Sequence, residues 1–146
     1  MIIQNKPKKK GYIEESFSAF DYKNLGKVRT AIDENYSTWF CLKDVCDILG
    51  IVNSRALNKR IPGDFMSSIC IEMITATKLD GTPAMQKIPM TFVNEAGLYL
   101  TIGRSRKLKA REFMVWVLSE ILPTLSKVIL QHRKKNEMQR QILKYN

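Results

Sequence analysis

Residues 39–50 have the sequence Trp-Phe-Cys-Leu-Lys-Asp-Val-Cys-Asp-Ile-Leu-Gly, and this stretch decides how the fold is organised. Its first three residues are typical of a short strand. The next apolar residues recur at i, i+3, i+4 and i+7, namely Leu42, Val45, Cys46 and Leu49. This spacing predicts one apolar face of a two-turn helix. Gly50 follows where a helix ends in the left-handed conformation, which glycine adopts at little cost.

The sequence before and after this stretch predicts strands. Residues 15–41 are strand-like and fit two or three short antiparallel strands. Residues 67–77 alternate in polarity, and 86–93 resume the pattern after a turn centred on Asp80-Gly81. We therefore expect a β-hairpin here.

The second half of the chain predicts helices. Asn94 is placed to cap a helix over about 95–102, and Ser105 is placed to cap the next one. Pro123 is expected to bend or end that second helix, and a basic helix follows to the end of the chain. The fold class is therefore α+β, with a small antiparallel sheet, several short helices and a long C-terminal basic helix.

Length and charge suggest one domain with basic ends. The chain has 146 residues, 45% of them hydrophobic, and a formal net charge of +10. Residues 99–146 contain eleven bases and three acids, and residues 1–11 contain four lysines and no acid. Segregated positive charge favours a polyanionic partner, although a solubility device or a disordered tail gives the same signal. No uninterrupted apolar run approaches the roughly 20 residues of a membrane span, so we expect a soluble intracellular protein that does not bind membranes.

Catalysis and metal binding have little support in the residues. The three cysteines form no CxxC pair, which suits a reducing compartment, and we expect all three to be small core residues: Cys41, Cys46 and Cys70. The single histidine, His132, rules out the common multi-histidine sites. Asp44 and Asp47 are expected to be solvated acids that the helix dipole favours. We expect no catalytic residue, no cofactor and no metal.

The two-helix unit over 42–61 resembles a helix-turn-helix. In that motif the second helix lies in the major groove of DNA, and its polar side chains contact bases. The expected second helix runs from Asn53 or Ser54 to about Arg60, and four polar residues face outward: Arg55, Asn58, Lys59 and Arg60. A simple helical hairpin with a solvated outer face remains the alternative.

A second basic cluster stands at the start of the helix expected after Ser105. It contains five bases in eight residues: Arg104, Arg106, Lys107, Lys109 and Arg111. Cations at a helix N-terminus oppose the helix dipole unless an anion docks there. We therefore assign these bases and Ser105 to phosphate binding. The flexible arm at 1–11 is expected to add non-specific contacts to DNA through Lys8, Lys9 and Lys10, although a purely solvating tail is equally compatible.

Several pieces of the chain, in order, resemble the Bro-N domain of baculovirus Bro proteins and phage antirepressors. They are Val28-Arg29, Trp39-Phe40, Lys43-Asp44-Val45, Leu49-Gly50, Asn94-Glu95-Ala96-Gly97-Leu98-Tyr99, Arg104-Ser105, Ala110, Phe113, Trp116-Val117, Glu120 and Leu122-Pro123. The resemblance implies a non-enzymatic domain over 12–127 that binds double-stranded DNA, of viral or prophage type. It also implies a role in transcription regulation or antirepression, in the host cytoplasm or nucleoid, or in the nucleus for a eukaryotic virus.

A second function remains open for the basic helical tail at 128–146. Its weak apolar stripe consists of Leu130, Met138, Ile142 and Tyr145. Such a stripe can pair with a partner helix, which would make the chain an interaction module that sequesters a repressor. It can also pair with itself in a homodimer. RNA binding is less favoured, because no paired aromatics at strand spacing offer a stacking surface.

Overall fold

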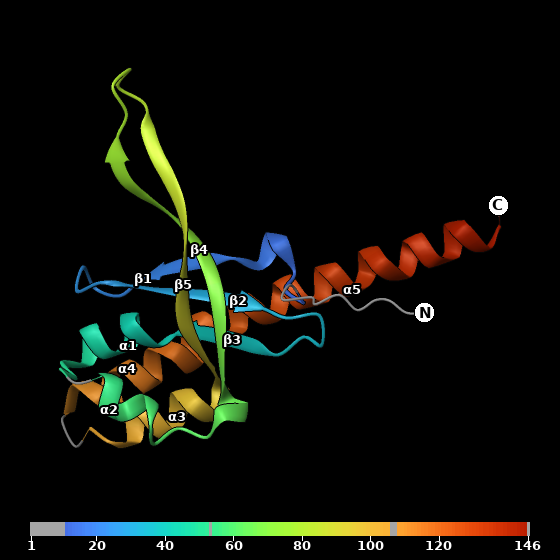
Figure 1. Ribbon diagram of the computed structural model, residues 1–146. Helices are drawn as coiled ribbons and strands as arrows, with labels where there is room; N and C mark the ends of the chain where they lie inside the picture. Colours follow the sequence, from blue (N-terminus) through green and yellow to red (C-terminus); the bar gives the residue numbers. More distant parts are fainter. Residues whose placement is uncertain (1–10, 53, 106–107, 146) are drawn as a thin grey trace.

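The computed structural model describes residues 11–52, 54–105 and 108–145. Within these residues there are five strands, five α-helices and three short 3-10 or π-helical segments (Figure 1). In chain order they are η2 (Glu14–Ser16), β1 (Ser18–Asp21), β2 (Lys27–Ile32), β3 (Thr38–Cys41), α1 (Leu42–Leu49), α2 (Ser54–Asn58), η3 (Gly63–Phe65), β4 (Met66–Thr77), β5 (Pro83–Asn94), α3 (Glu95–Gly103), α4 (Leu108–Trp116), η4 (Val117–Ile121) and α5 (Leu122–Lys144). The α+β class predicted from the sequence is confirmed.

All five strands form one antiparallel sheet in the order β1-β2-β3-β5-β4. β5 lies between β3 and β4, and its last residues pair with β3, where Trp39 opposes Asn94. β4 and β5 form the predicted hairpin, and its outer half projects well beyond the rest of the sheet (Figure 1). Gly81 takes a φ of 89° in the turn, a conformation that glycine supplies without strain.

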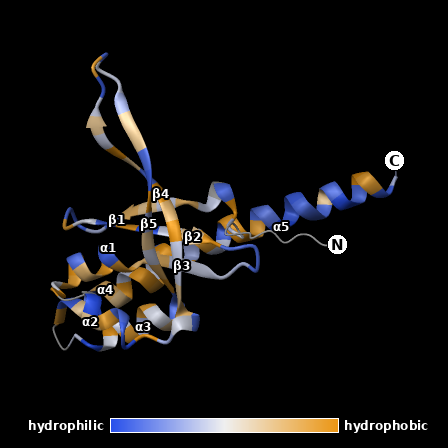
Figure 2. Cartoon of the chain, in the orientation of Figure 1, coloured by the Kyte–Doolittle hydropathy of each residue, from blue (hydrophilic) through white to orange (hydrophobic). Residues whose placement is uncertain are grey.

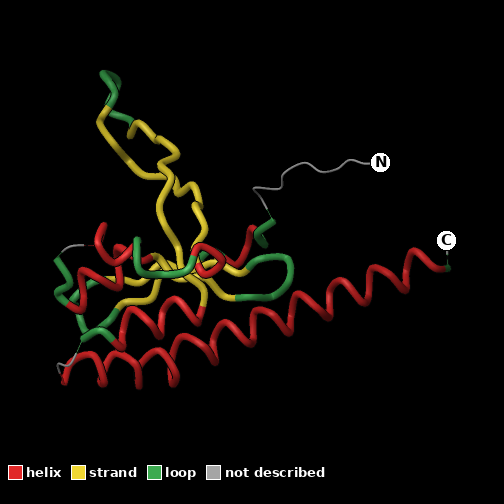
Figure 3. The backbone as a smooth tube through the Cα atoms, turned by 60° about the horizontal axis from the view of Figure 1, so that its bottom comes forward, coloured by secondary structure: helices red, strands yellow, loops and turns green. Residues whose placement is uncertain are grey.

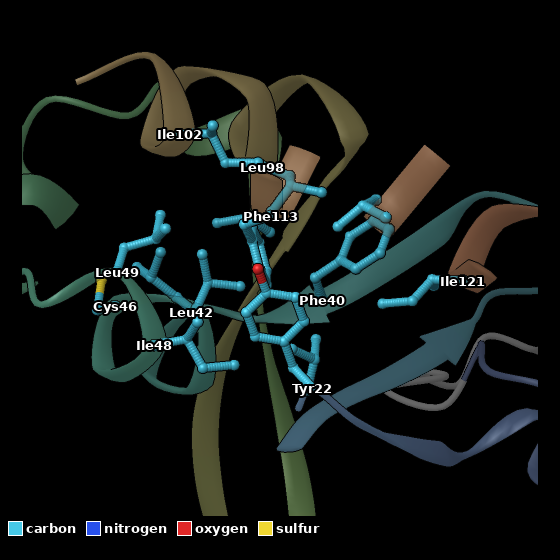
Figure 4. Packing of buried hydrophobic residues seen from close by; sticks show 14 of the residues in the cluster. Tyr22, Phe40, Leu42, Cys46, Ile48, Leu49, Leu98, Ile102, Phe113 and Ile121 are labelled. Atoms are coloured by element: carbon cyan, nitrogen blue, oxygen red, sulfur yellow. The ribbon is translucent and has the colours of Figure 1, made fainter. Parts of the chain in front are cut away.

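One face of the sheet carries the main core. The helices pack against this face, and Phe40 of β3 and Phe113 of α4 are fully buried there (Figure 4). Tyr22 lies edge-on to Phe113, with ring centroids 5.3 Å apart. The opposite face holds only a small second cluster around Phe92, which Tyr12 and Trp39 partly cover. The helices therefore leave much of that second face uncovered.

The helix predicted from the opening stretch is confirmed. α1 covers residues 42–49, and Gly50 follows with a φ of 72°, while its N–H donates to the Cys46 carbonyl. One expectation about this helix is wrong: Asp44 is not a solvated acid. Only 8% of it is exposed, and it forms an ion pair with Arg29 of β2. Asp47, by contrast, is exposed and pairs with Lys43 on the same helix.

Asn94 caps α3 as predicted. Its Oδ1 accepts a hydrogen bond of 3.0 Å from the Gly97 N–H. Gly97 itself has a packing role, because a Cβ added there would lie 2.8 Å from the Val93 Cβ and 3.1 Å from the Phe65 carbonyl oxygen. The absence of a side chain therefore lets α3 approach β5 and η3 closely.

Pro123 does not end the helix that contains it. The chain is helical from Leu108 to Lys144, and Figure 3 shows one long helix that extends away from the sheet. A π-helical segment, Val117–Ile121, comes directly before the proline. Such a segment shifts the backbone hydrogen bonds, which lets the helix accommodate a residue without an N–H. The apolar stripe predicted for this helix is confirmed, since Phe113, Val117 and Ile121 are fully buried.

The same continuous helix is long and apolar enough to cross a membrane by length and composition. An 18-residue window within it has a mean hydropathy of 1.6, and 22% of that window is buried in the fold. A core helix of a soluble protein meets the same criterion, and the buried stripe makes this helix part of the core. The expectation that the chain does not bind membranes stays a prediction.

The C-terminal half of α5 lies mostly outside the body of the fold and is largely hydrophilic (Figure 2). α5 contacts the turn between β2 and β3 through His132, whose Nδ1 lies 2.8 Å from the hydroxyl of Tyr36. Arg133 also stacks on the Tyr36 ring, 4.7 Å from its centroid. The sequence predicts that the domain ends at residue 127 and that a tail follows, but the helix is continuous there. The domain boundary itself stays a prediction.

Two of the three cysteines are in the core, as expected. Cys41 and Cys46 are buried, and burial raises the pKa of both thiols, that of Cys46 to about 11. Cys70 is exposed on β4, so its assignment to the core is wrong. The side-chain alternation of β4 predicts the strand correctly but not that the strand projects beyond the core.

Candidate nucleic-acid interface

A groove of about 710 Å³ lies between the α1–α2 unit and β5 of the hairpin. Arg55 and Asn58 of α2 line one side of it, and residues 88–91 of β5 line the other. Val52, at the turn between the helices, is 96% exposed at the rim. The groove thus combines a helix face with the base of a β-hairpin.

α2 is shorter than the sequence predicts. It ends at Asn58 rather than near Arg60, and the Arg60 N–H donates to the Leu57 carbonyl in a following turn. Leu57 and Ile61 are each only 4% exposed, so the predicted apolar side is confirmed. Leu57 and Ile61 hold the inner side of this segment in the core. Its outer side therefore exposes Arg55, Lys59 and Arg60. Asn53 or Ser54 was predicted to cap this helix; Asn53 lies outside the described residues, so this cap stays a prediction.

Asn58 has a buried hydrogen-bonding atom without a partner. Its Oδ1 contacts no donor within the described part of the chain, although the residue lines the groove. An amide leaves such an atom unsatisfied at a cost of about 1–3 kcal/mol. A carboxamide offers one acceptor and two donors, a set that matches the edge of adenine in the major groove. The residue borders the groove, although the Oδ1 itself is buried, so the amide must turn outward to meet a ligand there.

The second basic cluster lies where α3 ends and α4 begins. Arg104, Lys109 and Arg111 are exposed, and Ser105 is half-buried with its N–H donating to the Ile102 carbonyl. Arg106 and Lys107 lie outside the described residues, as do Lys8, Lys9 and Lys10. The first described residue of α4 is Leu108, so an anion site at the beginning of this helix stays a prediction.

The tertiary structure brings these two clusters to the same end of the molecule. A Cβ added at Gly50 would lie 3.1 Å from the Lys109 Nζ, so this amino group lies against the turn between α1 and α2. Figure 1 shows α2 and the beginning of α4 at that same end of the molecule. Lys109 also lies beside the C-terminal turn of α1, where the helix dipole favours a cation. We call the exposed bases of this region the basic surface: Arg55, Lys59, Arg60, Arg104, Lys109 and Arg111.

No base of the basic surface takes part in an ion pair with another described residue. Among the described residues the ion pairs are Arg29–Asp44, Lys43–Asp47 and Arg140–Glu137, and none of them includes a base of this surface. Unpaired guanidinium and ammonium groups on one surface are what phosphate binding needs.

The role of the hairpin in lining the site was not predicted from the sequence. Residues 88–91 were expected to be an ordinary strand, yet they form one wall of the groove. The available signal was Pro89, because a proline within a strand marks an unpaired edge. On its β3 side, β5 pairs only through Phe92, Val93 and Asn94, which leaves the edge at Pro89 open to the groove.

The described residues that line the groove give little support to a catalytic role. Cys46 lines the groove, but its raised pKa keeps the thiol protonated near neutral pH, and a protonated thiol is a weak nucleophile. Within the described ranges, no group of three or more His, Cys, Asp or Glu residues could hold a metal ion. The expectation of a non-enzymatic protein stays a prediction.

Comparison with known proteins gives one family and one relative. The family described as "BRO family, N-terminal domain" (Bro-N) matches residues 27–123. An uncharacterized protein of Haemophilus influenzae is 40% identical over 111 residues, which cover 76% of this chain and 50% of that protein. The chain therefore spans about half the length of this relative. No solved structure shows significant similarity to the chain.

Proposed function

Because the chain belongs to the BRO family and matches its N-terminal domain, we propose that it is a non-enzymatic protein that binds double-stranded DNA. One observation carries this proposal. Exposed bases from segments about fifty residues apart in the sequence gather at one end of the molecule, without ion-pair partners among the described residues. An unneutralised surface of this kind binds phosphates through charge and releases counterions.

The basic surface supplies the phosphate contacts in this proposal. Lys109 and Arg111 on α4 and Arg104 at the end of α3 would bind one backbone, and Lys59 and Arg60 would bind the other side of the groove. Such contacts position the protein without selecting a sequence. Affinity should therefore fall steeply with salt concentration.

Arg55 and Asn58 supply the base contacts. α2 has five residues, and an α-helix with its side chains is about 10–12 Å in diameter, which a major groove about 12 Å wide admits. Arginine is the common partner of guanine there and asparagine of adenine. The wall of the site formed by residues 88–91 would then lie beside the DNA, as β-ribbons do in other DNA-binding folds.

The test is a titration of labelled duplex DNA at several salt concentrations. We expect the Arg104→Ala/Lys109→Ala/Arg111→Ala variant, which removes three exposed bases of the basic surface, to lose at least about tenfold in affinity at low salt, and its salt slope to flatten by about two to three. The matched control is Lys134→Ala/Lys135→Ala/Arg140→Ala. It removes the same charge from exposed positions on α5, at the other end of the molecule. Equal binding by the two variants would contradict the assignment of the basic surface.

The biological role we propose is regulation of transcription in a virus or prophage, including relief of repression. The membership in the BRO family supports this role. Selection of bound sequences from a random duplex pool tests it, because a regulator should enrich a defined site.

A second candidate function is the capture of a repressor or other protein by α5. The observation in its favour is the exposure of apolar side chains in the last turns of that helix, where Met138 is 66% exposed and Ile142 is 55% exposed. A chain that shifts no DNA at low salt, and binds a repressor only with these residues intact, would favour this function over DNA binding.

A further inference from the structure

β4 presents a long unprotected strand edge. It is one of the two edge strands of the sheet and has twelve residues, whereas the other edge strand, β1, has four. Proteins usually protect long edges with lysine, proline or a covering segment. β4 contains no lysine, arginine or proline, and its single charged residue is Glu72. Its neighbour β5 contains Pro83, Lys87 and Pro89.

The regular part of this edge is residues 66–74. These nine residues pair with β5 without interruption, and a register shift between Ile74 and Ala76 ends the regular ladder. This strand edge also carries exposed apolar side chains: Ile74 is 64% exposed and Met73 is 37% exposed. Backbone groups on the outer side of β4 have no strand partner within the described residues. Together these features make the edge a template for another strand.

We propose that residues 66–74 of β4 pair antiparallel with the same residues of a second copy of this chain. Pairing the whole regular stretch places the two-fold axis at Cys70, its central residue. In this register Cys70 lies opposite Cys70 of the second copy, and Ile69 lies opposite Ile71. The exposed Ile74 then lies opposite Met66 of the second copy, which covers part of its side chain.

The charges of the strand favour a second copy as the occupant. With the axis at Cys70, Glu72 lies opposite Ser68, so no like charges face each other across the interface. β4 carries no cation, so it does not fit a nucleic-acid backbone. The hairpin projects away from the basic surface (Figure 1), which keeps the cationic ends of two copies apart. The proposal does not depend on DNA binding.

The first test is the association state of the full chain by sedimentation equilibrium. We expect a dimer, and we expect Cys70→Lys to raise its dissociation constant at least about tenfold, because two lysines then face each other at the axis. The matched control is Gln86→Lys, which adds the same charge at an exposed position of β5. A monomeric wild-type chain, or a Cys70→Lys dimer as tight as the control, would overturn the proposal.

A third variant separates this interface from pairing through the C-terminal helix. Met138→Lys/Ile142→Lys changes two exposed apolar residues of α5. We expect it to remain dimeric. A dimer that this variant dissociates and Cys70→Lys does not would assign the interface to α5 and overturn the pairing of β4.

The second test uses the native thiol as a probe. Directly opposite residues in an antiparallel pair have Cα atoms about 4.5–5.5 Å apart, within the reach of a disulfide. Since Cys70 is the one exposed cysteine of the three, mild oxidation with copper phenanthroline should link two copies through it. Cys70→Ser should abolish the covalent product and leave the sedimentation dimer. A covalent product that persists in Cys70→Ser, or none from the wild-type chain, would contradict the register at Cys70.

Discussion

Arg29 of β2 and Asp44 of α1 form a two-pronged ion pair that joins the sheet to the first helix. The Arg29 Nε donates to Oδ2 at 2.9 Å and Nη2 donates to Oδ1 at 2.8 Å, while the Arg29 backbone N–H also donates to Oδ2 at 2.9 Å. The hydrogen bond with this carboxylate raises the pKa of the guanidinium. Since Asp44 is nearly buried, its charge depends on these three donors.

Asp44→Ala should destabilise the fold by about 2–4 kcal/mol, because it leaves the Arg29 guanidinium without its partner in a partly buried place. The control is Asp47→Ala on the same helix, which removes an exposed pair with Lys43 and should change stability by less than about 0.5 kcal/mol. Urea unfolding followed by circular dichroism measures both. Equal losses of stability in the two variants would contradict a larger contribution from the buried Arg29–Asp44 pair.

Gly97→Ala should destabilise the fold by about 1–3 kcal/mol. The added methyl group would lie 2.8 Å from the Val93 Cβ and 3.1 Å from the Phe65 carbonyl, so α3 must move away from β5. Gly103→Ala in the same helix meets no atom within 4 Å and should leave stability unchanged or slightly raised. Thermal unfolding of the two variants provides the comparison, and a stable Gly97→Ala would contradict the close packing described here.

Asn58→Ala should relax the DNA sequence preference while leaving the salt dependence of binding unchanged. Its amide has an unpaired Oδ1 in the groove, and one bidentate base contact is worth about 1–3 kcal/mol of discrimination. Phosphate contacts determine the salt slope, and this variant removes none of them. Binding to the selected site and to a random duplex, each at several salt concentrations, measures the two effects. An unchanged preference would place the base contacts elsewhere.

The three thiols should differ sharply in reactivity. At pH 8 an aromatic disulfide reagent should titrate one thiol quickly in the folded protein, Cys70, and all three after unfolding, because Cys41 and Cys46 are buried with raised pKa values. Cys70→Ser should remove the fast phase. A fast phase that persists in this variant would contradict the burial of the other two cysteines.

The raised pKa of Cys46 also predicts an alkaline loss of stability. Its thiol has a pKa of about 11 in the folded chain and a usual value of 9.0, so the folded state holds the proton more tightly. Its contribution to stability is fully present below pH 9 and is lost as pH rises toward 11. Urea unfolding at pH 8 and pH 10.5 measures this loss, which should be smaller in Cys46→Ala.

Local signals predicted most elements of the fold. The spacing of Leu42 to Leu49 and the glycine after it predicted α1 and its end, and Asn94 predicted the beginning of α3. Pro123 was expected to bend or end its helix, and it does not end it: the π-helical segment Val117–Ile121 comes directly before the proline, and the helix continues to Lys144. The end of α2 was also wrong, since Lys59 and Arg60 have ordinary helix propensity and yet lie in the turn that leads to the buried Ile61.

The sequence by itself determined most of the strands and helices, their apolar faces, and where the bases cluster along the chain. Those properties depend on neighbours two to four residues away along the chain. Only the tertiary structure decided that Asp44 meets Arg29, that Lys109 lies against Gly50, and that residues 88–91 form a wall of the groove. These contacts join residues that are 15 or more positions apart, and the side chains at such positions become neighbours only when the sheet order and the packing of the helices are fixed.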